Sequence, residues 1–123
     1  MNTSTAQLNN FRQSPRKMRL VADMVRGKKV ANVLVNLEFT TKRAANPLKK
    51  LIESALANAK AGGVETEDLV IKKITIDSGK ILHRRRPAWR GIARPIRKRT
   101  SKITVELAPM TETKNKTKVK KKK

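Results

Sequence analysis

The chain lacks cysteine and tyrosine, and its aromatic side chains are limited to Phe11, Phe39 and Trp89. Without cysteine it can form neither a disulfide framework nor a thiolate metal site, and its core must be aliphatic. No apolar run approaches the roughly 18 residues of a membrane span. The first ten residues are polar and uncharged, unlike the basic and then apolar start of a signal peptide. We therefore expect a soluble, cytoplasmic protein that does not enter membranes.

Groups that perform catalysis are equally scarce. His83 is the only histidine, and it stands among arginines, where an imidazole more often contacts phosphate or stacks on a base than acts as a general base. No pair of carboxylates recurs at helical spacing in an apolar setting, and the acidic residues at 65–68 are expected to be solvated. No glycine-rich phosphate-binding loop is present. The sequence predicts a protein that is not an enzyme and needs neither a metal nor a cofactor.

Acidic residues are also few. The chain has nine of them and 31 lysines and arginines, which gives a formal net charge of +22. Residues 110–123 hold seven of the lysines and one of the acids, and we expect this segment to be a disordered basic tail after a single domain at 1–109. That domain is strongly basic without the tail. Since self-repulsion opposes compaction, we expect a polyanionic partner, and nucleic acid fits best.

The most informative stretch is residues 79–103. Ten of the 23 residues from 80 to 102 are Lys or Arg, and no acid occurs between Asp77 and Glu106. The flanking segments LVIKKITID and ITVEL are typical of β-strands, so we predict a long basic hairpin, the arm, at about 78–103. Half of it, about 12 residues at roughly 3.3 Å each, would reach about 40 Å, which is longer than so small a core. Arginine binds phosphate through a planar fork and also stacks on bases, so the arm is predicted to bind nucleic acid.

The tip of the arm is expected near Trp89. Its residues would be Pro87, Ala88, Trp89, Arg90, Gly91 and Ile92. Pro87 and Pro95 would lie almost opposite each other, and we expect regular strand pairing to stop below them, because proline cannot donate to a ladder. Trp89 is suited to base stacking and equally to a structural plug, and the sequence leaves both interpretations open.

The rest of the chain predicts an α+β domain, with three helices on one face of a small antiparallel sheet. Residues 6–12 are a weak strand candidate. A helix begins with Ser14 as N-cap and Pro15 at the first position, and Gly27 ends it. Apolar spacing predicts a second helix at 30–37.

A third helix is expected to run to about residue 61, with Thr40 or Thr41 as its cap. Pro47 would either kink it or restart it at Asn46, leaving 47–61 regular. The small residues at 54–59 are more typical of close packing against a sheet than of RNA contact.

Two strands complete the predicted sheet. Residues 69–77 change their apolar phase, which requires a bulge near Lys72-Lys73. Residues 102–107 alternate cleanly, and Asp77 is expected to pair near Lys102 or Ile103.

A second basic patch lies on and after the first helix. It consists of Arg16, Lys17, Arg19, Arg26, Lys28 and Lys29. Beside a basic arm, such a patch favours RNA contact over simple solvation.

Three segments resemble a known family. SPRKMRLVADMVRGKK, LIESALANA and PAWRGIARPIRKRTSKITV occur in order between residues 12 and 107, and they resemble bacterial large-subunit ribosomal protein number twenty-two, the universal uL22 family. The resemblance implies a small α+β domain with one long hairpin that binds 23S ribosomal RNA and bridges several of its domains during assembly. It also implies that the hairpin lines the nascent-peptide exit tunnel, with neighbouring large-subunit proteins and the nascent peptide as further partners.

The resemblance also implies site residues. On the first helix it adds Ser14 and Gly27 to the basic patch. In the arm the matching positions are Arg84, Pro87, Gly91, Ala93, Ile96, Lys98, Arg99, Thr100, Ser101 and Ile103. Together with the arm's own charges, the predicted RNA-binding set is Lys80, His83, Arg84, Arg85, Arg86, Arg90, Arg94, Arg97, Lys98, Arg99, Ser101 and Lys102.

The chain departs from the family pattern at four positions. Ala88 and Ile92 stand where the family usually has arginine. Trp89 replaces a small residue, and Lys102 replaces a histidine.

The main alternative is a nucleoid architectural protein. Such proteins insert basic β-arms, with a proline near the tip, into the DNA minor groove. Their arms normally project from an intertwined dimer, whereas this sequence shows no exposed apolar seam, so we expect no homo-oligomer. A membrane-active cationic protein would need an amphipathic helix with bulky aromatic anchors, which the sequence lacks.

Overall fold

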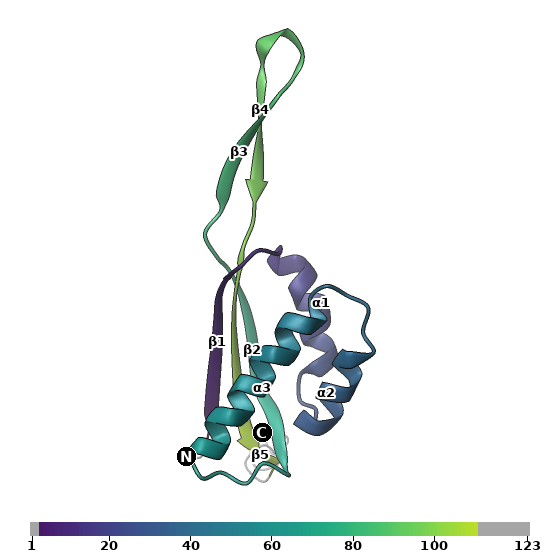
Figure 1. Ribbon diagram of the computed structural model, residues 1–123, viewed down its shortest axis with the longest axis vertical. Helices are drawn as coiled ribbons and strands as arrows, with labels where there is room; N and C mark the ends of the chain where they lie inside the picture. Colours follow the sequence, from purple (N-terminus) through teal and green to yellow (C-terminus); the bar gives the residue numbers. More distant parts are fainter. Residues whose placement is uncertain (1–2, 111–123) are drawn as a thin grey trace, which may run out of the picture.

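The computed structural model describes residues 3–110. Its elements in chain order are β1 (Ser4–Phe11), α1 (Pro15–Val25), α2 (Val30–Glu38), α3 (Ala45–Ala61), β2 (Leu69–Ser78), β3 (Leu82–Pro87), the 3₁₀ turn η1 (Trp89–Gly91), β4 (Ala93–Lys98) and β5 (Ser101–Pro109). The predicted tail lies, apart from residue 110, outside the described residues. The strands form a three-stranded antiparallel sheet in the order β1-β5-β2 and a separate ribbon of β3 and β4 (Figure 1). The predicted α+β class with a projecting hairpin is confirmed.

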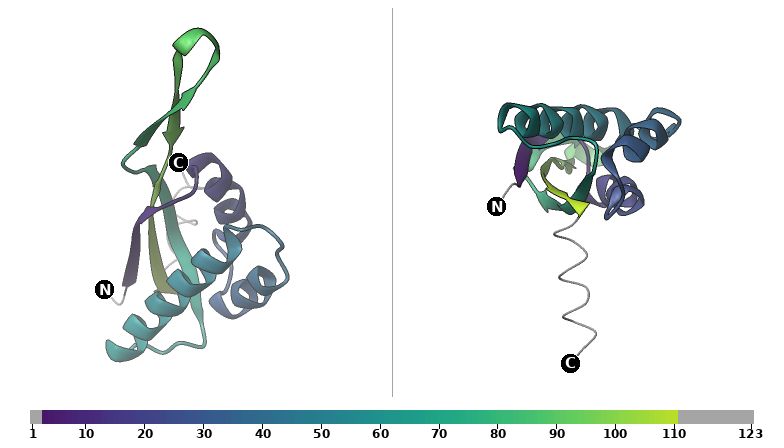
Figure 2. Two further views of the ribbon diagram at one scale, coloured as in Figure 1. Left: turned by 45° about the horizontal axis from the view of Figure 1, so that its top comes forward. Right: turned by 90° about the horizontal axis from the view of Figure 1, so that it is seen from below.

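All three helices lie on one face of the three-stranded sheet, which the view along the long axis makes plain (Figure 2, right). The buried core is aliphatic, as expected. Met18 of α1, Leu48 of α3 and Ile103 of β5 are each 0% exposed. The burial of these apolar side chains provides the main driving force for folding.

Helix α1 begins and ends where the sequence predicts. Pro15 is its first residue, but the side chain of Ser14 makes no capping hydrogen bond. Instead the backbone carbonyl of Ser14 accepts hydrogen bonds from the amides of Lys17 and Met18, at 3.1 and 3.2 Å. Gly27 adopts a φ of 75° just after the helix, the left-handed conformation that favours glycine.

Helix α3 differs from the prediction at its start. It begins at Ala45, so neither threonine caps it. Thr40 instead lies just beyond α2, where its hydroxyl donates a 2.7 Å hydrogen bond to the carbonyl of Asn36. Pro47 does not kink the helix, because it is the third residue of α3, where a backbone N–H has no partner within the helix. The helix starts afresh two residues before the predicted regular stretch at 47–61.

The small residues of α3 pack closely on the sheet, as predicted. Ala55 and Ala59 are 0% and 1% exposed. Two side chains join the helix to β1: the Ser4 hydroxyl donates to the carbonyl of Ala55, and the Asn58 amide donates to the carbonyl of Thr5 at 3.0 Å.

The register of β2 against β5 confirms the predicted bulge. Ile71 pairs with Leu107 and Lys73 pairs with Glu106, so Lys72 is the extra residue. Beyond the bulge the ladder is regular, and Asp77 pairs with Lys102 as expected.

The arm differs from the prediction in which residues pair with its two prolines. Pro95 lies opposite Arg85, and Pro87 lies opposite Ala93, so the two prolines do not face each other. Pairing continues to the tip instead of stopping below them. The two prolines occupy ladder pairs two residues apart, so both pairs are of the same kind in the alternating hydrogen-bond pattern of antiparallel strands. A proline is tolerated in the kind of pair where its nitrogen points away from the partner strand.

The arm leaves the body through a tight joint between the two sheets. The Gly79 amide donates to the Thr100 carbonyl at 2.8 Å, and the Thr100 hydroxyl donates to the Lys80 carbonyl at 2.6 Å. A Cβ atom at position 79 would collide with the Thr100 hydroxyl. Glycine is therefore required at this joint, and Thr100 is buried there, at 4% exposure.

Candidate nucleic-acid interface

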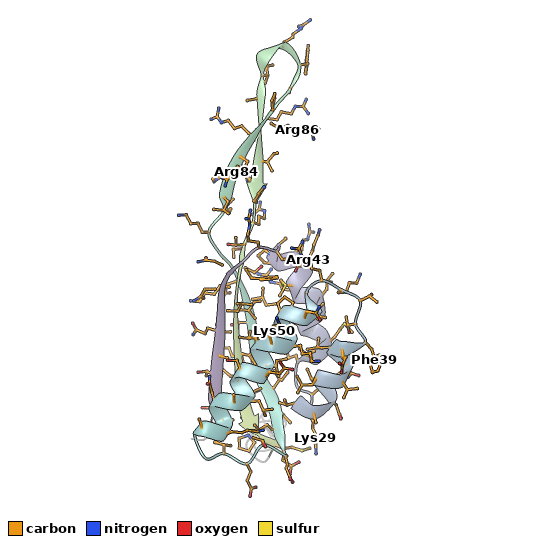
Figure 3. All side chains as sticks on the ribbon, in the orientation of Figure 1. Lys29, Phe39, Arg43, Lys50, Arg84 and Arg86 are labelled. Carbon is orange, nitrogen blue, oxygen red and sulfur yellow. The ribbon has the colours of Figure 1, made fainter. Side chains whose placement is uncertain are left out.

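The arm carries positive charge on both faces. Strand pairing places Arg84, Arg86, Arg94 and Lys98 on one face, with Leu82 and Ile96. The opposite face carries His83, Arg85 and Arg97, with Pro87, Ala93 and Pro95. No residue from Lys80 to Arg99 is buried, and Figure 3 shows Arg84 and Arg86 far from the body. The arm can therefore meet polyanions on both sides.

Like charges face each other across the ribbon. Arg86 pairs directly with Arg94, an arrangement that destabilises a two-stranded ladder. No carboxylate forms an ion pair with the arm among residues 3–110. An isolated hairpin is only marginally stable in water, so external anions would stabilise this one.

The tip exposes an aromatic side chain. Trp89 is 61% exposed, and the Arg90 guanidinium lies over its ring at 4.6 Å from the centroid. This exposure rules out the structural-plug interpretation of Trp89. Arg90 itself has a φ of 54°, so the tip turns through a left-handed residue.

Not every predicted RNA-binding residue is accessible. Ser101 is 0% exposed, and its hydroxyl donates to the carbonyl of Gln13 at 2.5 Å. This burial gives Ser101 a structural role at the joint and removes it from the candidate RNA contacts. Lys80 and Lys102, by contrast, are exposed at the base of the arm.

Three cations of the helix patch bind the protein's own groups. Arg19 donates through Nε and Nη2 to the carbonyl of Ile76, at 3.2 and 3.0 Å. Arg26 forms an ion pair with Asp23 at 2.9 Å. Lys29 likewise forms an ion pair, at 3.0 Å, with a loop carboxylate. Arg19 therefore holds α1 to β2, and Arg26 adds a 3.4 Å hydrogen bond from its Nη2 to the Ile74 carbonyl of the same strand.

The remaining cations of the patch do not lie together. Arg16 and Lys17 are exposed at the start of α1, whereas Lys28 is exposed beyond its end. The 11 residues of α1 separate the two groups by about 16 Å at 1.5 Å per residue. Only the first group lies at the arm end of the body (Figure 1). Ser14 lies at this end as well, and Gly27 lies at the other, where its amide donates to the carbonyl of Ile71 at 3.1 Å.

Sequence reasoning missed three basic residues that the fold brings to the arm end. Arg12 follows β1, and Lys42 and Arg43 lie between α2 and α3. They line a cleft together with Lys17 and the arm residues 97–99. Figure 3 shows Arg43 near the base of the arm and Lys29 at the opposite end of the body. No local pattern marks these residues, because they come from separate turns.

Other classes of site are not found in the described part of the chain. Residues 3–110 contain no group of three or more His, Cys, Asp or Glu side chains that could hold a metal. Among the helices described, none has the length and apolar character needed to cross a bilayer.

The sequence comparisons decide the family. Residues 6–108, which span the body and the whole arm, match the family model described as "Ribosomal protein L22p/L17e". The chain belongs to the L22p/L17e family of ribosomal proteins. Family members are structural components of the large ribosomal subunit, so this chain is a structural ribosomal protein and not an enzyme.

Curated relatives agree with this assignment. The chain is 48% identical over 106 residues to large ribosomal subunit protein uL22 of Christiangramia forsetii. The match covers 83% of this chain and 78% of the relative. It is 47% identical over 112 residues to the protein of the same name from Flavobacterium psychrophilum, covering 88% of this chain and 82% of that one. Its L22p/L17e membership places the chain in association with the large ribosomal subunit and its RNA.

Proposed function

We propose that the protein binds 23S ribosomal RNA through both its body and its arm, and that it bridges several RNA domains as the large subunit assembles. The observation that carries this proposal is the arm. Its residues 80–99 all lie outside the core, carry positive charge on both faces and have no acidic partner among the described residues. A ribbon with charge on both faces is suited to RNA packed around it, since arginine forks bind phosphates bidentately.

The mechanism is charge neutralisation at a distance from the core. Twelve residues separate Ser78 at the end of β2 from Arg90 at the tip, which corresponds to about 40 Å of extended chain. An arm of this reach can contact RNA segments that the body does not touch. By neutralising their phosphates, the protein would hold together RNA segments that otherwise repel one another.

The tip supports a role at the nascent-peptide exit tunnel. Within residues 87–92 only Arg90 is charged, while Trp89 and Ile92 are 61% and 54% exposed. The tip is thus less charged and more apolar than the shaft of the arm. Such a surface is suited to the tunnel wall, where it would meet the nascent peptide.

The helical side of the body offers a surface for a neighbouring large-subunit protein. Phe39 is 81% exposed and Val35 is 54% exposed. Val35 lies within α2 and Phe39 just after its last residue, so the two are four residues apart and share one face. Figure 3 shows Phe39 projecting from that side. Exposed aromatic side chains of this kind are enriched where proteins meet. As part of a bacterial-type ribosome, the protein would reside in the cytoplasm.

The test is to assemble large subunits with an armless variant, in which Asn-Gly replaces residues 80–99. We expect the variant to be incorporated less efficiently and the RNA around the tunnel to change its chemical reactivity. Unchanged reactivity around the tunnel would contradict the proposed role of the arm. A separate competition of double-stranded DNA against 23S RNA for the wild-type protein tests the proposed RNA preference, and tighter binding to DNA would contradict it.

A further inference from the structure

A cleft lined mostly by basic residues lies at the arm end of the body. Its volume is about 970 Å³, and three distant segments line it: the start of α1 with the residues before it, residues 42–44, and residues 97–99 of the arm. Its cationic residues are Arg12, Lys17, Lys42, Arg43, Arg97, Lys98 and Arg99, and no carboxylate lines it. We call this surface the basal cleft.

The cations of the basal cleft have no counter-ion in the described chain. The ion pairs of residues 3–110 are Arg26–Asp23, Lys29–Asp68, Lys49–Glu38 and Lys73–Glu106, and all four lie outside the cleft. Each of the seven cations is exposed. Concave surfaces lined by one sign of charge concentrate the electric field and attract counter-charged ligands.

Two helices add positive potential to the same cleft. Ser14 and Ala44, the residues that precede α1 and α3, both line it. Neither helix has a side-chain cap or an acidic residue in its first turn, and both begin near the base of the arm (Figure 1). Helix N-termini carry partial positive charge, which favours phosphate.

One uncharged wall residue could offer RNA a hydrogen-bond acceptor. Gln13 lines the cleft, and its Oε1 is the one buried side-chain polar atom among residues 3–110 without a hydrogen-bond partner. A ribose 2′-hydroxyl is a donor that would satisfy this oxygen once the amide turns toward the cleft. Acidic protein side chains carry no such donor when ionised, and DNA lacks this group altogether.

We propose that the basal cleft holds one segment of RNA backbone, which contacts the body and the base of the arm at the same time. This proposal rests on the proposed function and names where its body contact lies. Because the arm joins the body only through the short joint at Gly79 and Thr100, RNA seated between the two would also fix the direction of the arm.

The first test compares two double variants of equal charge. K42Q/R43Q removes two cleft cations, whereas K60Q/K73Q removes two exposed lysines outside it. Binding to deproteinised 23S RNA from Flavobacterium psychrophilum, the source of one of the relatives described above, is measured against salt concentration. For K42Q/R43Q we expect affinity at least about tenfold lower and a log–log salt slope shallower by about 1.4 to 1.8. For the matched control we expect a change below about twofold.

The outcomes separate the two proposals. If the wild-type protein binds the RNA and K42Q/R43Q binds within twofold of it, the cleft proposal is wrong and the proposed function stands. If the wild-type protein shows no selectivity for this RNA, both fail. Lys42 and Arg43 are exposed and make no ion pair among the described residues, so we expect K42Q/R43Q to fold normally. An unchanged thermal unfolding curve would verify this.

The second test maps the RNA in assembled large subunits. Since the chain has no cysteine, an iron chelate can be tethered at one introduced thiol. Thr41→Cys lies on the body side of the cleft, Ile96→Cys on the arm side, and Ala88→Cys at the tip. We expect hydroxyl radicals from the first two to cleave overlapping nucleotides and those from the third to cleave others. Separate cleavage sites from positions 41 and 96, or no cleavage from either, would overturn the proposal.

Discussion

Replacing the arm with a two-residue turn should leave the body folded. Gly79 and Thr100 face each other across the joint, with the Gly79 amide donating to the Thr100 carbonyl at 2.8 Å. Asn-Gly is the favoured two-residue connection between strands paired in this way. The armless variant therefore keeps Gly79 and Thr100 and joins them by Asn-Gly in place of residues 80–99.

The expected stability change is small because the removed segment contributes nothing to the core. None of residues 80–99 is buried, and only Ile81, Leu82 and Ala88 are partly covered. The loss of the hydrogen bond from the Thr100 hydroxyl to the Lys80 carbonyl costs about 0.5–1.5 kcal/mol, and the removal of nine positive charges reduces self-repulsion in the opposite direction. We expect a net change within about 1 kcal/mol, which corresponds to a Tm shift of at most about 4–8 °C.

The assay is thermal unfolding followed by circular dichroism, with Leu48→Ala as a matched core control. Leu48 is 0% exposed, so its truncation should cost about 2–5 kcal/mol and lower Tm by at least twice as much as removal of the arm. In parallel, the salt slope for 23S RNA should become shallower by about 3–4 if half of the nine removed charges engage phosphate. An armless variant without a cooperative transition, or with an unchanged salt slope, would refute this division between body and arm.

Other predictions follow from single features. For the wild-type protein, the log–log slope of 23S RNA binding against salt should be about −5 or steeper, and a slope near −1 would exclude an extended electrostatic footprint. Amide exchange of the free protein should be fast at 84–97 and slow at 51–59, and equal protection of both would mean that the arm packs on the body. Trp89 is the only tryptophan in a chain without tyrosine, so its fluorescence reports on the tip alone; we expect it to change on RNA binding, and an unchanged spectrum would argue against contact there. Thr100→Val, which removes the 2.6 Å hydrogen bond to the Lys80 carbonyl, should lower stability by about 1 kcal/mol and speed amide exchange at Gly79, with Thr41→Val as an exposed control.

The sequence by itself determined the features that depend on near neighbours along the chain. A run of cations between two alternating apolar segments predicted the arm, because charges that cannot be buried must project from the core. The change of apolar phase predicted the bulge at Lys72, and Gly27 marked the end of α1, since both follow from local backbone geometry. The alternating strands on either side of the arm also predicted the pairing of Asp77 with Lys102, because a hairpin brings the residues at its two ends together, and their combination with three helical segments predicted the α+β class.

Only the tertiary structure decided which residues meet across the fold. The six cations of the helix patch look alike in sequence, yet Arg19 binds a strand carbonyl and Lys29 binds a carboxylate 39 residues away. Ser101 matches an RNA-binding motif and is nevertheless buried. The basal cleft brings together segments around Arg12, Arg43 and Lys98, whose separation along the chain leaves no periodic pattern. The physical reason is that a charge acquires its role from the groups that surround it in space, and chain folding alone sets those surroundings.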